Sequence, residues 1–398
     1  MTRIFILIFL LSSIYGFATD KIKSIKVGEA LNNKEEVKLS QFGKSIKYFV
    51  LGEGDVYLPG QTIANICISD NKILFIPIGQ PEYGIYKFDL DGKLISCSIN
   101  RGRHESEFYQ ISASAVSPRT GDILLLEYDR ILKIDVHGNY VGSIQLNDKF
   151  ENGARYVDII FDGDSNFILL WHGRDYIYKA TGISMDGKVI FTHELGYASG
   201  YQVKNIVING KKVSSRGLFK ACLFNDNEVC FTSEILDIIY SLDKGKKSVK
   251  YKLDWGNRVK SSLIDNALSH RMPSLIPNLD IKNIHSPNLL FFDFTIPPNM
   301  NPSLSYKERR TGVLYNKIKD ISYSPAYDSF YESFGLTNDI DGGAPFWPKF
   351  MTKKKMYQII DAIDFIEMAE KSTSARMKEV ASQLTEESNP VVVEVTLK

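Results

Sequence analysis

The stretch that decides the fold is Phe88-Asp89-Leu90-Asp91-Gly92-Lys93-Leu94-Ile95, because the chain repeats it. The copies are Ile134-Asp135-Val136-His137-Gly138-Asn139-Tyr140-Val141, Ile183-Ser184-Met185-Asp186-Gly187-Lys188-Val189-Ile190 and the more divergent Ser241-Leu242-Asp243-Lys244-Gly245-Lys246-Lys247-Ser248. Each copy has the pattern of a strand end, a tight turn closed by glycine, and the start of the next strand. Glycine adopts the positive φ that such a turn needs, and Asp or Asn tolerates it.

The spacing of these turns indicates a β-propeller. Glycines 92, 138, 187 and 245 are 46, 49 and 58 residues apart. A period of this size, with apolar residues alternating along each strand, is typical of one four-stranded blade per repeat. Stacked blades bury both faces of each sheet against their neighbours. The pattern predicts blades over residues 62–100, 109–146, 155–195 and 202–253, the last with an insertion at 209–216.

The rest of the chain predicts further strands and a few helices. Strands are expected at 22–27, 37–39, 46–51, 289–296, 312–322 and 329–336, and a long loop at 297–310. One short helix is expected at 261–268 and two more at 361–369 and 375–384, with Thr373 or Ser374 as N-cap of the last. Residues 354–360 fit a strand or the start of a helix. Pro390 ends the helical region, and Val391–Leu397 is a strongly β-prone terminal strand.

The N-terminus has the features of a secretory signal peptide. Arg3 supplies the positive charge, an apolar run follows from Ile4 to Leu11, and Gly16-Phe17-Ala18 fits a cleavage site. The run is shorter than the roughly 20 residues of a membrane span; an uncleaved anchor is the less favoured alternative. We therefore expect a signal peptide at 1–18, a single domain at 19–398, and a periplasmic or secreted protein. No lipid anchor is expected, because the first cysteine is Cys67.

Charge and cysteine content limit the possible functions. Removing residues 1–18 takes away Arg3 and no acidic residue, so 48 basic against 47 acidic residues becomes 47 against 47. This balance excludes the basic field of a nucleic-acid binder. The four cysteines, at 67, 97, 222 and 230, lack metal-ligand spacing. Cys222 and Cys230 flank a predicted turn and either form a disulfide or, as we favour, remain thiols.

Three features resemble the secreted bacterial six-bladed β-propellers of the TolB-like superfamily. They are the Asp-x-x-Gly hairpins, Asp339-Ile340-Asp341-Gly342-Gly343 with Pro345-Phe346-Trp347-Pro348, and Ser388-Asn389-Pro390 before the terminal strand. The resemblance implies an all-β, six-bladed propeller closed by N- and C-terminal strands, here with short C-terminal helices, and it implies export. It implies no general activity. Gly102–Phe108 stands where many members carry a Gly-x-Gly-Pro-Gly-Glu-aromatic loop, and keeps only the first Gly, the Glu and the aromatic residue.

The candidate ligand site lies in the loops between the second and third strands of the blades. Such loops line one mouth of a propeller channel, and here they carry acidic, Arg, His and Tyr residues, which suit a polar ligand. The candidate residues are Glu82, Tyr83, Tyr128, Arg130, His172, Arg174 and Asp175. The alternative is that these are ordinary surface loops. Asp339 and Asp341 fit a tight turn better than a metal or acid/base pair, because no third ligand is spaced nearby.

No catalytic motif stands out in the sequence. Gly-x-Ser-x-Gly, P-loop and Rossmann patterns are missing, and the six histidines form no metal-binding pair. We therefore expect a non-catalytic binding or interaction module without a cofactor. Its partner would be a polar small molecule, a glycan or a protein, with no nucleic acid and no membrane span. The alternative is a metal-assisted hydrolase or lyase with Ca²⁺ or Zn²⁺ in the channel.

Overall fold

A computed structural model describes much of the chain outside the N-terminal segment. It covers residues 22–52, 56–58, 64–69, 72–77, 84–98, 102, 104–117, 120–146, 149–151, 153–163, 166–174, 177–197, 206–208, 211–213, 219–225, 228–233, 238–243, 245–256, 276–278, 288–295 and 303–398. The predicted signal peptide at 1–18 and the predicted helix at 261–268 lie outside the described residues.

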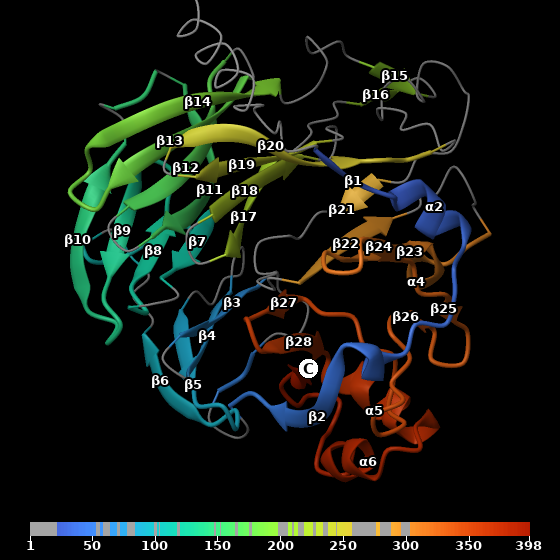
Figure 1. Cartoon of the computed structure of the whole chain (residues 1–398). Helices are drawn as coiled ribbons and strands as arrows, with labels where there is room; N and C mark the ends of the chain where they lie inside the picture. Colours follow the sequence, from blue (N-terminus) through green and yellow to red (C-terminus); the bar gives the residue numbers. More distant parts are fainter. Residues whose placement is uncertain are drawn as a thin grey trace, which may run out of the picture.

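Six sheets are arranged as the blades of a β-propeller (Figure 1). Blade one comprises β3 (Ala64–Ser69), β4 (Lys72–Pro77), β5 (Ile85–Phe88) and β6 (Leu94–Ser98). Blade two comprises β7 (Ala113–Val116), β8 (Ile123–Leu126), β9 (Arg130–Ile134) and β10 (Tyr140–Gln145). Blade three comprises β11 (Arg155–Asp162), β12 (Asn166–His172), β13 (Ile177–Ser184) and β14 (Val189–Tyr197). The first strands of neighbouring blades, β3, β7, β11 and β17, contact one another and so lie nearest the axis.

Blade four has an added strand and an added hairpin, and blade five follows it in the ring. Blade four comprises β17 (Phe219–Asn225), β18 (Glu228–Ser233), β19 (Ile238–Asp243) and β20 (Lys246–Leu253), with β1 (Lys23–Ile25) parallel to β20 as a fifth strand. The hairpin of β15 (Ile206–Ile208) and β16 (Lys211–Val213) accounts for the predicted insertion. Blade five comprises β21 (Ile276–Asn278), β22 (Leu289–Thr295), β23 (Arg310–Asn316) and β24 (Ile321–Tyr323).

Blade six closes the ring with both ends of the chain. It comprises β27 (Phe350–Met351), β28 (Lys355–Ile360), β29 (Val391–Leu397) and, outermost, β2 (Gly43–Val50). The C-terminal β29 pairs antiparallel with β28 on one side and with β2 on the other. The predicted closure is therefore confirmed. Between β28 and β29 lie α5 (Ala362–Lys371) and α6 (Ala375–Ala381), and the Ser374 side chain caps α6.

Three sequence-based assignments were wrong, and a fourth was correct but too long. The expected strand at 329–336 is a tight hairpin of β25 (Tyr327–Asp328) and β26 (Ser333–Phe334). The Asp328 carboxylate accepts the Phe330 and Tyr331 backbone N–H groups and thereby forms the turn. The strand expected at 22–27 is present as β1 but ends at Ile25, before α2 (Val27–Asn32), whereas the strand expected at 37–39 is replaced by the 3₁₀ turn η1 (Leu39–Gln41). The expected loop at 297–310 contains α4 (Tyr306–Arg309), which the capping box of Ser305 and Glu308 starts.

The hydrophobic core is divided among the spaces between blades. The described buried residues form six clusters, one between each pair of neighbouring blades. Strand β12 shows why the core is divided in this way, because its side chains point alternately into two clusters. Phe167, Leu169 and Trp171 pack toward blade two, whereas Ile168 and Leu170 pack toward blade four. A strand with this nearly continuous apolar sequence is buried on both faces.

No helix in the described part of the chain has the length and apolar content needed to cross a bilayer.

Candidate functional site

The described candidate residues lie where the second and third strands of blades two and three are joined. Tyr128 lies between β8 and β9, and Arg130 begins β9. His172 ends β12, and Arg174 follows it in the turn toward β13. Glu82, Tyr83 and Asp175 lie outside the described residues. The four described candidates therefore occupy equivalent ends of two adjacent blades.

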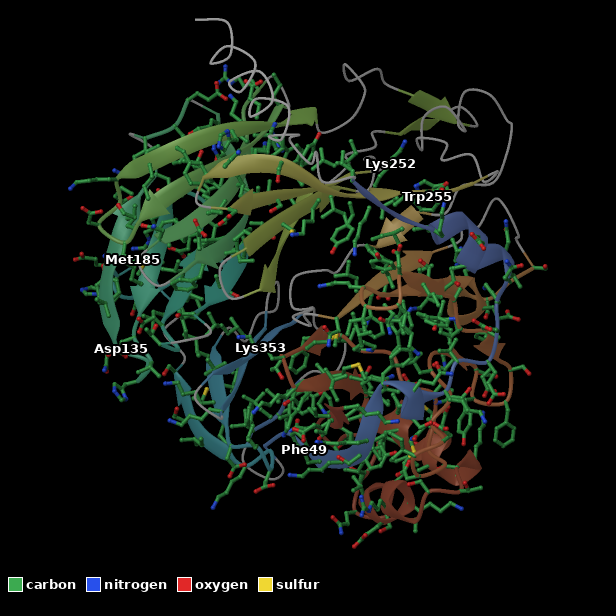
Figure 2. All side chains as sticks on the ribbon, in the orientation of Figure 1. Phe49, Asp135, Met185, Lys252, Trp255 and Lys353 are labelled. Carbon is green, nitrogen blue, oxygen red and sulfur yellow. The ribbon has the colours of Figure 1, made fainter. Side chains whose placement is uncertain are left out.

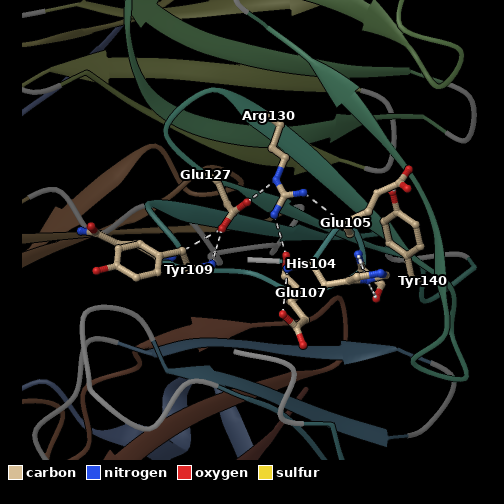
Figure 3. Close-up of polar contacts among 9 residues, drawn as sticks. His104, Glu105, Glu107, Tyr109, Glu127, Arg130 and Tyr140 are labelled. Atoms are coloured by element: carbon tan, nitrogen blue, oxygen red, sulfur yellow. Dashed lines mark hydrogen bonds and ion pairs between the residues drawn. The ribbon is translucent and has the colours of Figure 1, made fainter. Parts of the chain in front are cut away.

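Arg130 binds the loop that leads into blade two (Figure 3). Its Nε donates to Oε2 of Glu127 at 2.5 Å, and the two side chains are only 15% and 7% exposed. Its two terminal nitrogens donate to the carbonyl oxygens of Glu105 at 3.1 Å and Glu107 at 2.6 Å. The planar fork of the guanidinium thus joins β9 to residues 104–110. Arg130 therefore helps to hold this loop in its conformation.

Glu127 fixes the far end of the same loop. Its Oε1 accepts the backbone N–H of Tyr109 at 2.5 Å and that of Gln110 at 3.4 Å. Inside the loop, the Glu107 carboxylate accepts the His104 N–H at 2.8 Å. The buried Phe108 ring anchors the loop in the core between blades one and two. The described residues of the segment 102–108, noted from the sequence, are therefore held by the Arg130–Glu127 pair, by the Glu107 carboxylate and by the buried Phe108 ring.

Two tyrosine side chains project from this support into solvent. Tyr128 is 83% exposed and Tyr109 is 55% exposed. Glu127 connects them, because its carboxylate holds the backbone of Tyr109 and Tyr128 follows it in the chain. In Figure 3 the ring of Tyr109 points away from Arg130. Large exposed rings on a fixed backbone are a common feature of binding surfaces.

Aromatic residues continue from Tyr128 onto blade three. The pKa of Tyr156 is raised to about 12, first by burial and then by the nearby charge of Asp129 and the Tyr128 phenol. Phe150 packs edge-on against Tyr156 at 5.5 Å and against Trp171 at 4.9 Å between ring centres. We call Tyr109, Tyr128 and Tyr156 the tyrosine row. Tyr109 precedes β7 of blade two, Tyr128 lies between β8 and β9 of the same blade, and Tyr156 lies in β11 of blade three.

Two ion pairs lie beside the tyrosine row. Lys179 lies with Nζ 3.3 Å from the Glu151 carboxylate and 4.7 Å from the centre of the Trp171 ring. Arg130 and Lys179 are therefore each paired with a glutamate.

His172 and Arg174 have different roles next to the row. His172 is buried, with Nδ1 2.9 Å from the Gly173 carbonyl oxygen and its ring 5.1 Å from that of Tyr178. Arg174 is exposed and lies over Gly153, with its Nε 2.6 Å from the position that a Cβ would take there. Of the described candidates, Tyr128 and Arg174 therefore face solvent, whereas Arg130 and His172 lie beneath them.

The Asp339-x-Asp341 motif serves the structure. Asp341 accepts the Tyr48 hydroxyl at 3.1 Å, the Asn338 amide at 2.8 Å and the Ser374 hydroxyl at 2.6 Å. Asp339 accepts the backbone N–H and the hydroxyl of Ser40. The turn interpretation of this motif is confirmed. Across the described ranges, no three His, Cys, Asp or Glu side chains gather as a metal-binding group.

Sequence reasoning missed Tyr109, Glu127 and the loop contacts of Arg130. Tyr109 belongs to the connection between blades, whereas the predicted site was confined to loops within blades. The available signal was a Glu and an Arg three residues apart at a strand end, which favours an ion pair across the turn.

Comparison with known proteins gives the family. A family model described as a domain of unknown function (DUF4934) matches residues 22–396. The chain belongs to the DUF4934 family. No curated protein matches this DUF4934 chain at a significant level.

Two solved structures share the fold of this DUF4934 protein. One is a presumed exported protein from Bacteroides fragilis, with TM-score 0.66 and 15% identity over 94% of this chain and 99% of that one. The other is a member of the DUF4221 family from Bacteroides vulgatus, with TM-score 0.51 and 13% identity over 92% and 99%. At these identities the likeness shows the fold alone.

Proposed function

We propose that this protein is an exported, non-catalytic recognition module that binds a polar ligand at the tyrosine row. The observation that carries the proposal is the buried Arg130–Glu127 pair beneath the exposed Tyr109 and Tyr128. A buried ion pair adds little net stability, because desolvating both charges offsets their attraction. Here the pair fixes the loop that presents Tyr109. Preorganised contact groups lower the entropy lost on binding.

Two sources support export. The solved relative from Bacteroides fragilis is itself presumed to be exported. Residues 1–18 have the charge, apolar run and small residues of a secretory signal. A periplasmic or secreted location without a lipid anchor, and kinship with the TolB-like superfamily, are part of the same proposal.

A binding assay with product analysis tests the function. The purified protein is incubated with a panel of saccharides, lactones and peptides, and bound ligand is recovered and weighed by mass spectrometry. We expect at least one ligand to be retained with its mass unchanged. The double variant Tyr109→Ala/Tyr128→Ala should lose it, whereas Tyr57→Ala, with a tyrosine 62% exposed outside the row, should keep it. Turnover of a panel member would contradict the proposal.

The metal-assisted hydrolase or lyase stays the alternative prediction. Elemental analysis of protein purified without chelators tests it, together with melting before and after addition of EDTA. A stoichiometric metal whose removal lowers the melting temperature would favour this alternative.

A further inference from the structure

The tyrosine row offers exposed aromatic faces. Tyr128 is 83% exposed and Tyr109 is 55% exposed, so much of each ring meets water. Tyr156 lies next to them, partly buried against Phe150. A flat, exposed ring suits a ligand with a flat face of C–H groups, whereas an apolar side chain needs an enclosing pocket.

Hydrogen-bonding groups surround these rings. The phenol of Tyr156 stays protonated at neutral pH and can donate, and Asp129 stands beside it as an acceptor. Glu151 is 45% exposed, and Arg174 is exposed at the start of the neighbouring turn. Donors and acceptors therefore lie near Tyr128 and Tyr156, where blade two meets blade three.

The charge distribution argues against a charged ligand. Glu127 neutralises Arg130, and Glu151 pairs with Lys179 at 3.3 Å. A nucleic acid would stack its bases on the rings but would also need a cationic path for its phosphates. Arg130 and Lys179 are each paired with an acid, and Arg174 alone among the cations named here does not make such a path. A ligand that combines C–H faces with many hydroxyl groups and no charge fits best.

We infer that the ligand of the tyrosine row is an uncharged saccharide chain, with sugar rings stacked on Tyr109 and Tyr128 and hydroxyl groups bonded to the polar side chains between them. This inference rests on the proposed binding function and names its ligand class. Tyr109 and Tyr128 would set affinity through their rings, and Asp129 with Tyr156 would bind hydroxyl groups. Arg130 and Glu127 would be positioning residues.

Isothermal titration of the full chain tests the inference. The probes are neutral hexasaccharides of glucose, mannose, galactose and xylose, with heparin, single-stranded DNA and a peptide library in parallel. Tyr109→Ala and Tyr128→Ala should each weaken binding of at least one neutral hexasaccharide about tenfold, the loss of one ring contact. Tyr109→Phe and Tyr128→Phe should retain most of the affinity. Tyr57→Ala should bind like the wild type, and unchanged melting temperatures confirm that the variants fold.

The salt dependence gives a second readout. Affinity for the neutral sugar should change less than about twofold between 50 and 500 mM salt, whereas binding to heparin or DNA would fall steeply. If the row variants abolish binding of a peptide or an anion and leave the sugars unaffected, the saccharide inference is overturned and the proposed binding function stands. If no probe binds in a way that depends on Tyr109 or Tyr128, both are overturned.

Discussion

At the scale of single residues, the repeated turn glycines meet two separate demands. Gly92 has φ of +88° and Gly138 has φ of +91°, which residues with a Cβ rarely adopt. Each turn also lies against the preceding blade. A Cβ on Gly92 would collide with the Val50 carbonyl oxygen of β2, and one on Gly138 would lie 2.9 Å from the Ser98 hydroxyl of β6. The repeat found in the sequence is therefore also a contact between blades.

Alanine at Gly92 and at a control glycine separates the cost of the positive φ from the cost of the close contact. Gly163, with φ of +70° and no atom within 4 Å of its Cβ position, is the control. Gly163→Ala should lose about 1–2 kcal/mol from the left-handed backbone alone. Gly92→Ala should lose roughly 1–3 kcal/mol more, because the Val50 backbone cannot move aside as a side chain can. Urea denaturation measures both, and equal losses would contradict the close contact.

Asp341 is the residue that ties the ends of the chain together. Its carboxylate accepts hydroxyl groups from Tyr48 in β2 and from Ser374 before α6. Asp341→Asn should lower the free energy of unfolding by about 1–3 kcal/mol, since hydrogen bonds to a charged group are lost. Asp339→Asn, on an exposed residue, is the matched control and should lower it less. A ranking in the opposite order in thermal and urea unfolding would disprove the assignment.

Tyr156 makes the free energy of unfolding depend on pH in the alkaline range. Its pKa is raised from 10.0 to about 12 in the folded protein, first by burial. Between pH 10 and 12 the unfolded chain therefore loses this proton before the folded protein does, and stability falls as pH rises. Tyr156→Phe should remove this part of the fall. Urea unfolding at pH 8, 10 and 11 measures it, and parallel pH profiles for wild type and variant would contradict the prediction.

At the scale of elements, basic side chains join successive blades at the same point of each turn. Lys47 donates to the Leu90 carbonyl at 3.1 Å, Lys87 to the Val136 carbonyl, and Lys133 to the Met185 carbonyl at 3.1 Å. Each accepting residue stands two positions before its turn glycine. Figure 2 shows Met185 on the outer edge of the ring. At blade four, His193 bonds the Gly245 carbonyl instead.

Lys133→Met tests the value of one such link. The substitution removes the bond to Met185 but keeps the apolar stem, so unfolding should become easier by about 0.5–1.5 kcal/mol. Lys188→Met, which breaks an exposed ion pair with Asp186, should change stability by about 0–1 kcal/mol. Urea midpoints compare the two variants. A smaller effect for Lys133→Met than for Lys188→Met would show that the link contributes nothing.

At the scale of the whole molecule, residues 22–50 form a belt across three blades. Strand β1 extends blade four, α2 contacts β23 and β24 of blade five, and β2 is the outermost strand of blade six. Figure 1 shows this segment running along one side of the ring. The belt and β29 together connect the start of the chain to its end.

Two truncations should have different consequences. Deleting 391–398 removes β29 from between β28 and β2, the two strands that pair with it. We expect loss of cooperative unfolding, measured by circular dichroism and hydrogen exchange. Deleting residues up to 34 removes β1 and α2 but leaves each blade its four strands, so a folded but less stable protein is expected. A cooperative transition after the first deletion would disprove closure by β29.

Local patterns predicted much of this architecture and little of the site. The strands around Gly92, Gly138 and Gly187, the cap at Ser374 and the strand 391–397 could be located because alternation and turn chemistry are local properties. The hairpin at 327–334 was mistaken for a strand, because its turn depends on one carboxylate. Tyr128 and Arg174 were found as exposed loop residues. The burial of Arg130 and His172 could not be inferred, since neighbouring segments cover them.

The amino-acid sequence by itself determined the repeated blade, its glycine turns and the strand that ends the chain, because each depends on neighbours within a few residues. Only the tertiary structure decided which segments meet. It placed Arg130 against a loop some 25 residues away and put lysines of one blade on the turns of the next. These contacts form when blades stack, and stacking depends on the burial of apolar faces that residues far apart in the chain supply.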